Sequence, residues 1–257
     1  MDSHLNILSS VLICMFLFSV ESATIPSILT DKEALISIKA SLSLSPSFWD
    51  HNSSPCNWTG VVCSNKTSPR VVVLDLSSLG LTGSISTYIG NLSFLNSLQL
   101  QNNKLSGNIP SEIVNLKRLR SLNLSSNALG GSFPSNMIQL AALQVLDFTA
   151  NNITGMLPKE LSHLTKLRVL NVAQNKIYGS IPTAISNLSL LTDLNLGTNS
   201  LSGMIPSELS LLHKLQHLDL SLNQLTGTIA PSIYNLSSLV YFTVASNQLW
   251  GQIPIDI

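Results

Sequence analysis

Asparagine recurs every 24 residues over most of this chain, and a glycine follows each one four residues later. Only a structural repeat keeps such a register without a slip over so many units. A unit this short cannot bury its own apolar residues, so the chain must fold as a stack of coils. The recurring asparagines are Asn103, Asn127, Asn151, Asn175, Asn199, Asn223 and Asn247.

Within a unit, two apolar residues spaced by two precede the asparagine, as Leu122 and Leu124 do before Asn127. This spacing places both leucines on one side of a short strand. Asn127 then lies where the chain leaves the strand, and we expect its amide to bond turn backbone groups that lack a ladder partner. Stacked units predict a ladder of such side chains. The return segment is expected to add Leu129, Phe133 and Ile138 to the core.

The coil pattern LxxLxLxxNxLxGxIPxxIxN resembles the plant extracellular leucine-rich repeat. Its Gly-x-Ile-Pro part, present at 107–110 and 179–182, is the hallmark of the plant type. The resemblance implies an α/β solenoid, a right-handed superhelix with a parallel concave β-sheet and a second set of short strands on one flank. It covers residues 71–257, about eight repeats, the last of them incomplete.

Residues 24–70 are similar to the N-terminal cap of plant receptor-like kinases, in which a helix and a disulfide shield the first coil. Residues 30–33, Thr-Asp-Lys-Glu, predict a capping box that opens a helix with Leu35, Ile38 and Leu42 on one face. Such a cap covers an open strand edge, which is an aggregation hazard. We expect Trp58 to pack over the first coil.

The apolar run at residues 7–20 is too short for a bilayer span, which needs about 20 residues, but fits a signal-peptide core. Residues 1–23 are therefore predicted to be a signal peptide, with a buried core helix as the alternative. Export leaves Cys56 and Cys63 as a pair in an oxidising compartment. A disulfide between them is favoured over a metal site, because no further ligands are suitably spaced.

Charged residues make up 10% of the chain and the formal net charge is zero, so a strong nucleic-acid binder is not expected. No later run is apolar enough to span a membrane. Glycans are expected to supply solubility. The chain has eight Asn-x-Ser/Thr sequons, at Asn52, Asn57, Asn65, Asn91, Asn123, Asn152, Asn187 and Asn235.

No catalytic constellation, metal site or cofactor motif is found. His213 and His217 straddle the start of a strand, and two ligands without a third do not make a catalytic metal site. Binding is therefore the predicted class of function. An extended peptide is expected to lie across the concave sheet, where small Ala173 and Gly197 leave room; alternatively, these positions vary freely and the ligand contacts other coils. The candidate ligand-binding residues are Val145, Val169, Asn171, Asp193, Asn195, His217, Asp219 and Tyr241.

The resemblance implies the ligand-recognition module of a plant receptor-like kinase in immune or developmental signalling. Its partners would be an extracellular peptide or protein and a co-receptor with its own leucine-rich-repeat ectodomain. No kinase motif is present and the last coil is not completed, so we expect the front of a longer plasma-membrane receptor rather than an enzyme. The alternatives are a short secreted protein resembling polygalacturonase inhibitors, and a decoy fragment without its own ligand.

Overall fold

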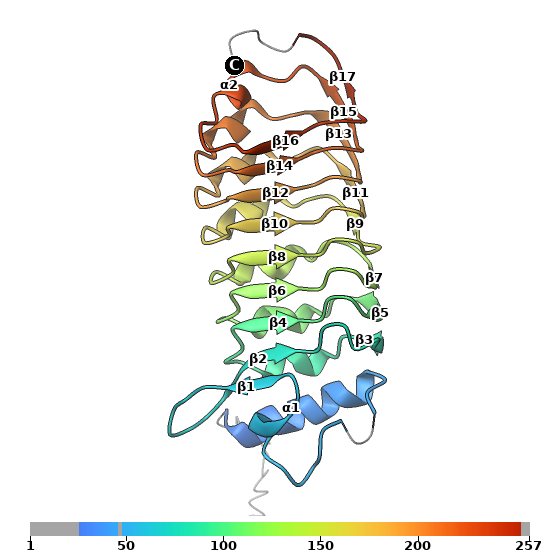
Figure 1. Cartoon of the computed structure of the whole chain (residues 1–257), viewed down its shortest axis with the longest axis vertical. Coiled ribbons are helices and arrows are strands. Elements are labelled where there is room, and N and C mark those ends of the chain that lie inside the picture. The colour runs from blue at the N-terminus through green and yellow to red at the C-terminus, as the bar shows by residue number, and fades with distance from the viewer. Residues whose placement is uncertain (1–25, 46–47, 253–257) are drawn as a thin grey trace, which may run out of the picture.

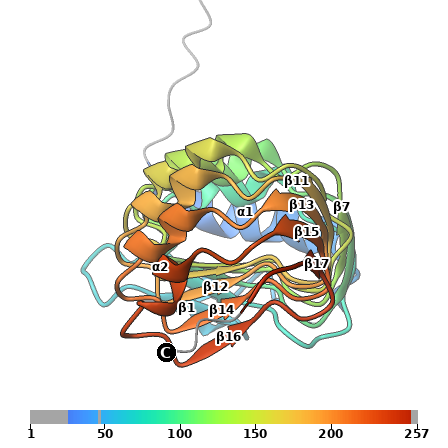
Figure 2. The same cartoon turned by 90° about the horizontal axis from the view of Figure 1, so that it is seen from above.

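The computed structural model describes residues 26–45 and 48–252, and within them the chain winds into stacked coils (Figure 1). The predicted signal peptide, residues 1–23, and the final segment 253–257 lie outside the described residues. Seen along the stack, the concave strands form one wall, short helices form the opposite wall, and a second set of strands closes one flank (Figure 2). Leucines from the walls fill the space between them, as the 24-residue period predicts.

The concave sheet has nine strands in the described part of the chain. All neighbours are parallel except the first pair, in which a cap strand runs antiparallel to the first coil. The strands are β1 (Val61–Cys63), β2 (Val71–Asp75), β4 (Ser97–Gln99), β6 (Ser121–Asn123), β8 (Val145–Asp147), β10 (Val169–Asn171), β12 (Asp193–Asn195), β14 (His217–Asp219) and β16 (Tyr241–Thr243).

The flank carries two further sheets in place of one continuous sheet. Within the part of the chain that the structure describes, a single bridge between Ser132 and Thr154 links them. The break follows Gly130 and Gly131, and consecutive glycines weaken a strand. One sheet holds β3 (Thr82–Ser84), β5 (Lys104–Asn108) and β7 (Ala128–Gly130); the other holds β9 (Thr154–Gly155), β11 (Lys176–Gly179), β13 (Ser200–Met204), β15 (Gln224–Gly227) and β17 (Gln248–Leu249).

Short helices form the convex wall, and in coils two to six each begins directly after the recurring proline. Proline fixes φ and has no N–H, so it suits the residue that leads into such a helix. Met137 fills the core position of its coil, and Ile138, which the sequence pattern placed there, is only half-buried. The helices of this wall are η2 (Thr87–Asn91), η3 (Ser111–Asn115), η4 (Ser135–Gln139), η5 (Lys159–His163), η6 (Thr183–Asn187), η7 (Ser207–Leu211) and α2 (Pro231–Tyr234). A further short helix, η1 (Pro55–Asn57), lies in the N-terminal cap against β1.

The recurring asparagines join successive coils by hydrogen bonds. The Asn175 amide nitrogen donates to the carbonyls of Phe148, Val172 and Ala173, at 2.9 to 3.1 Å, and its oxygen accepts from the Ile153 N–H at 2.9 Å. The other six recurring asparagines make the same kind of contacts, each reaching the preceding coil. Each side chain therefore ties its own turn to the coil before it.

The residue before each recurring asparagine has a left-handed backbone, although none of these residues is glycine. Thr198, for example, has φ of 54°, and its N–H donates to Ser221 of the next coil. A β-branched residue is strained in this region by about 1–2 kcal/mol. The left-handed conformation persists despite this strain because it directs the Thr198 N–H toward the Ser221 carbonyl of the next coil.

We expect Thr198→Gly to raise the free energy of unfolding by about 0.5–1 kcal/mol, since glycine removes the strain but adds unfolded-state entropy. Thr226→Gly is the control, because Thr226 lies in β15 outside the left-handed set and should lose about 1 kcal/mol. Urea unfolding followed by circular dichroism measures both. Equal losses in the two variants would show that the turn carries no strain.

The N-terminal cap packs helix α1 (Ile28–Ser41) against the first coil. Leu35, Ile38 and Leu42 are buried, as expected, but the helix begins earlier than the sequence pattern indicates. Ser27 is the N-cap: its hydroxyl accepts from the Thr30 N–H, and the Thr30 hydroxyl accepts from the Ser27 N–H. Thr30 is thus at position N3, the last residue of the capping box and not its first.

A disulfide joins Cys56 and Cys63 in the cap. Beside it, Trp58 is buried and stacks on Trp49, with 5.2 Å between the ring centroids. The Trp49 indole N–H donates to the Thr59 carbonyl. Trp58 therefore packs within the cap, against a second tryptophan, and helps to fix the segment that leads into β1.

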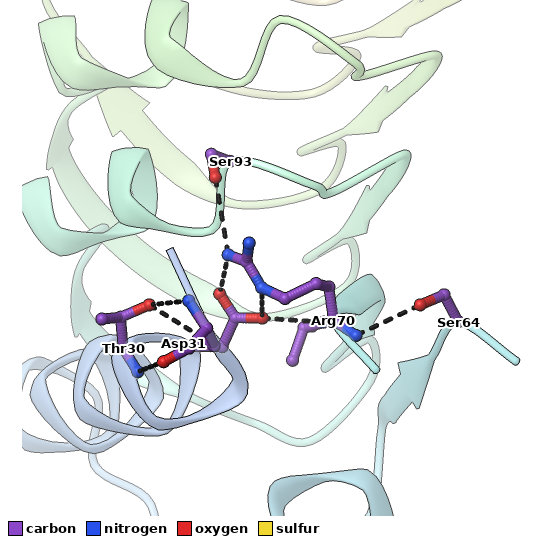
Figure 3. A network of polar contacts seen from close by, with 7 residues as sticks. Thr30, Asp31, Ser64, Arg70 and Ser93 are labelled. Carbon is purple, nitrogen blue, oxygen red and sulfur yellow. Dashed lines mark hydrogen bonds and ion pairs between the residues drawn. The ribbon is translucent and has the colours of Figure 1, made fainter. Parts of the chain in front are cut away.

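A buried ion pair connects the cap helix to the first coil (Figure 3). The Arg70 guanidinium donates to both oxygens of Asp31, at 2.6 and 2.9 Å, and the Val71 N–H donates to the same carboxylate. The two side chains are 5% and 0% exposed. On its other side the guanidinium lies 4.1 Å from the Phe94 ring centroid.

Candidate functional site

The predicted ligand-binding residues lie on neighbouring strands of the concave sheet, in register. An outer row pairs directly from strand to strand, and an inner row runs parallel to it two residues later. Adjacent strands are about 4.8 Å apart, so each row is a regular track along the stack. The outer row is Val145, Val169, Asp193, His217 and Tyr241; the inner row includes Asn171, Asn195 and Asp219.

The inner row stabilises the turns that follow the strands. Asn171 and Asn195 each accept a hydrogen bond from the backbone N–H two residues later. Asp219 accepts from both the N–H and the hydroxyl of Ser221, at 2.9 and 2.6 Å. Such local bonds are common for Asn and Asp at turns. The inner side chains therefore have a structural task, which the sequence analysis did not separate from ligand binding.

The outer row makes fewer contacts of this kind. His217 and Tyr241 are exposed, and Val145 and Val169 are half-buried. His217 Nδ1 lies 2.7 Å from Asp193 Oδ1, and the Thr192 hydroxyl donates to the other Asp193 oxygen at 2.6 Å. The structure thus pairs a carboxylate with an imidazole and places a phenol in register on the next strand.

The space expected beside Gly197 is already occupied. A side chain there would meet the Asp219 carboxylate, whose nearest oxygen would lie 2.9 Å from the added Cβ. Ala173 is buried as well. Although Ala173 and Gly197 are small, neighbouring atoms fill the space beside them. These two positions therefore leave no room for a ligand, contrary to the sequence-based interpretation.

The concave strands of the described coils carry carboxylates but no Lys or Arg. Asp75, Asp147, Asp193 and Asp219 lie on this sheet, and neither Lys nor Arg occurs in β2 or in the even-numbered strands from β4 to β16. Within the same residues no group of three or more His, Cys, Asp or Glu side chains is arranged to hold a metal ion. The site consequently offers hydrogen bonds and negative charge across an open surface.

Seven of the eight sequon asparagines lie away from the outer row, on the cap, the helix wall or the flank. Asn123 is the exception, since it belongs to β6 on the concave sheet. Its side-chain oxygen accepts from the Ser125 N–H and hydroxyl. Glycosylation of all eight remains a prediction; a glycan on Asn123 would cover the early coils and leave the outer row from Val145 onward open.

Comparison with known proteins matches this chain to leucine-rich repeats along most of its length. The family description "Leucine-rich repeat region" matches residues 71–184, "Leucine rich repeat N-terminal domain" matches 28–64, and "Leucine Rich Repeat" matches 214–236. The solved leucine-rich-repeat ectodomain of the receptor kinase SOBIR1 from Arabidopsis thaliana is 30% identical, with a TM-score of 0.50. This chain covers 92% of that ectodomain, and the match spans 76% of this chain. The chain belongs to the plant leucine-rich-repeat ectodomain family.

Other members of this ectodomain family are similar over a larger or better-matched part of the chain. The Arabidopsis receptor kinase HAESA, solved in complex with the peptide hormone IDA and the co-receptor SERK1, is 36% identical with a TM-score of 0.81, covering 88% of this chain and 39% of that one. The LRR receptor-like serine/threonine-protein kinase EFR of Arabidopsis thaliana is 43% identical over 79 residues, which are 29% of this chain and 8% of EFR. The match therefore spans less than a tenth of that kinase, and it lies in the ectodomain.

None of the helices within the described part of this ectodomain has the length and hydropathy that crossing a bilayer requires.

Proposed function

We propose that this ectodomain is the ligand-recognition part of a plant receptor kinase at the cell surface, and that it has no catalytic activity of its own. HAESA, which is similar over 88% of this chain, was solved with a peptide hormone and a co-receptor. By analogy, the partners proposed here are an extracellular peptide and a co-receptor with a leucine-rich-repeat ectodomain. The relatives are receptor kinases, which favours this function over a secreted inhibitor or a decoy.

The observation that carries the proposal is the outer row of the concave sheet. It presents Asp193, His217 and Tyr241 on consecutive strands, free of the turn-stabilising bonds that occupy the inner row. An extended peptide that crosses the strands would meet one side chain about every 4.8 Å. Because the concave strands carry carboxylates without Lys or Arg, the ligand is expected to carry positive charge.

A linear-peptide display library selected on the ectodomain tests this proposal. We expect enrichment of peptides with basic residues, and about a tenfold loss of affinity for an enriched peptide on Tyr241→Ala or Asp193→Ala, because exposed aromatic and charged anchors dominate such interfaces.

Tyr178→Ala is the matched control for Tyr241→Ala. The two tyrosines are 52% and 51% exposed, but Tyr178 lies in β11 on the flank. The affinity of the Tyr178→Ala variant for the enriched peptide should equal that of the unmodified protein. A selection that yields no peptide, or peptides that tolerate Tyr241→Ala and Asp193→Ala, would refute the proposed site.

A further inference from the structure

Basic residues concentrate at one edge of the solenoid, in the turns that lead from the short helices into the concave strands. The equivalent segments of three successive coils are 115–120, 139–144 and 163–168. They contain five of the thirteen Lys and Arg residues of the whole chain, and none contains Asp or Glu. We call the five residues the basic edge: Lys117, Arg118, Arg120, Lys166 and Arg168.

The backbone holds the basic edge in register. The Gln144 N–H donates to the Arg120 carbonyl, and the Arg168 N–H donates to the Gln144 carbonyl, both at 2.8 Å. Arg120 and Arg168 therefore lie two coils apart in one column, about 10 Å from each other along the stack. The turns that carry them form a continuous edge beside the strand arrows (Figure 1).

These positive charges have no acidic partner among residues 26–45 and 48–252. All five side chains are exposed. The ion pairs among the described residues are those of Arg70 with Asp31 and of His217 with Asp193, and neither involves the basic edge. Lys117 donates to the neutral Gln139 side chain, and Arg118 lies 3.8 Å from the centroid of the Phe94 ring. Although the net charge of the chain is zero, the concave strands carry carboxylates and the adjoining edge carries cations, so the two signs of charge lie on different surfaces.

We propose that the basic edge binds a linear acidic polysaccharide that lies along the solenoid axis. The charges are exposed and lie in register on the first and third of the three coils, with none in segment 139–144. Such a pair of charged coils suits a stiff polyanion with carboxylates at regular spacing. The carboxylates of the concave strands repel such a chain and confine it to the edge. This inference does not depend on the proposed peptide recognition, because it uses a different surface and the opposite charge.

An acidic protein fits the basic edge less well. Protein interfaces depend on aromatic or apolar anchors that enter pockets. No large exposed hydrophobic residue lies in the three segments, and the Phe94 ring is flanked by the guanidiniums of Arg70 and Arg118. The strands beside the edge are hydrogen-bonded on both sides, so they cannot accept an added peptide strand.

The predicted glycans flank the basic edge without covering it. Asn91, Asn187 and Asn235 begin the equivalent turn segments of other coils, and none of the three basic-edge segments contains a sequon. Glycans at Asn91 and Asn187 would stand on either side of residues 115–168. A ligand along the edge therefore has an open stretch of three coils.

Binding of the secreted protein to immobilised polygalacturonate tests the inference. The neutral control is the same polymer with its carboxylates fully methyl-esterified. We expect binding to polygalacturonate only, weakened steeply by salt between 50 and 200 mM, since exposed charge interactions are screened. The triple variant Arg120→Gln, Lys166→Gln, Arg168→Gln should bind about tenfold more weakly.

The matched control variant is Lys104→Gln, Lys159→Gln, Lys176→Gln, which removes the same charge from exposed positions on the flank and the helix wall. It should bind as the unmodified protein does. Equal losses in both triple variants, or equal binding to the methyl-esterified polymer, would overturn the proposal. Binding of polyglutamate as tight as that of polygalacturonate would overturn the choice of a polysaccharide.

Discussion

Replacing Arg70 by leucine is expected to lower the free energy of unfolding by about 3–5 kcal/mol. The variant leaves the Asp31 carboxylate, which is 0% exposed, without its bidentate partner between the cap helix and the first coil. Only the Val71 N–H would still donate to that carboxylate. Urea unfolding measures the loss, and fluorescence of Trp49 and Trp58 reports the cap once Trp250, in the last coil, is replaced by phenylalanine in every variant.

Arg118→Leu is the matched control for Arg70→Leu. Both guanidiniums lie against the Phe94 ring, that of Arg118 at 3.8 Å and that of Arg70 at 4.1 Å from its centroid. Of the two, the Arg70 guanidinium is the one that binds a carboxylate. The control should lose about 1 kcal/mol or less. The double variant Asp31→Leu, Arg70→Leu should recover more than half of the loss, because it removes the buried charge. If Arg118→Leu were as costly as Arg70→Leu, the stacking and not the ion pair would hold the cap.

Replacing Asn175 by alanine is expected to cost about 2 kcal/mol of unfolding free energy. The change leaves the Ile153 N–H without its acceptor, whereas the Phe148 and Val172 carbonyls keep a bond from the Asn151 and Asn199 side chains, respectively. The Ala173 carbonyl keeps a second bond, from the Ala150 N–H. Because coils are stabilised through their neighbours, the unfolding transition should also broaden.

Asn171→Ala provides the comparison in the same coil. The Asn171 side chain accepts a single bond of 3.3 Å, from the Ala173 N–H, so its removal should cost less than about 1 kcal/mol. Circular dichroism during urea unfolding distinguishes the two variants. A loss below 1 kcal/mol in Asn175→Ala would show that water replaces the amide and that the ladder contributes little.

The stack of coils could be predicted because its cause is local and repeated. The spacing of Leu122, Leu124 and Asn127 specifies a strand, a buried face and a turn within one unit, and the period repeats that specification. Where residue type was followed in place of the period, the prediction failed. Ile138 has the branched aliphatic side chain usual at this position, but Met137 shares the phase of Ile113 and is the buried residue.

The features that escaped prediction depend on contacts between distant segments or on ambiguous local chemistry. Asp31 and Arg70 are 39 residues apart, and nothing in either segment marks them as a pair. Thr30 can act as an N-cap or as the N3 residue of a capping box, and only the position of Ser27 decides between the two. Likewise, the turn bonds of Asn171 and Asp219 could not be separated from ligand binding until the backbone was known.

The register of the concave strands has a consequence for how such a protein can change over evolutionary time. Each surface row takes one residue from each coil, while the leucines and the asparagine of that coil hold the scaffold. A substitution at Asp193 or His217 therefore alters one point of a surface without disturbing the scaffold beneath it. Duplication or loss of a whole 24-residue unit would lengthen or shorten every row at once, so recognition and architecture can diversify independently.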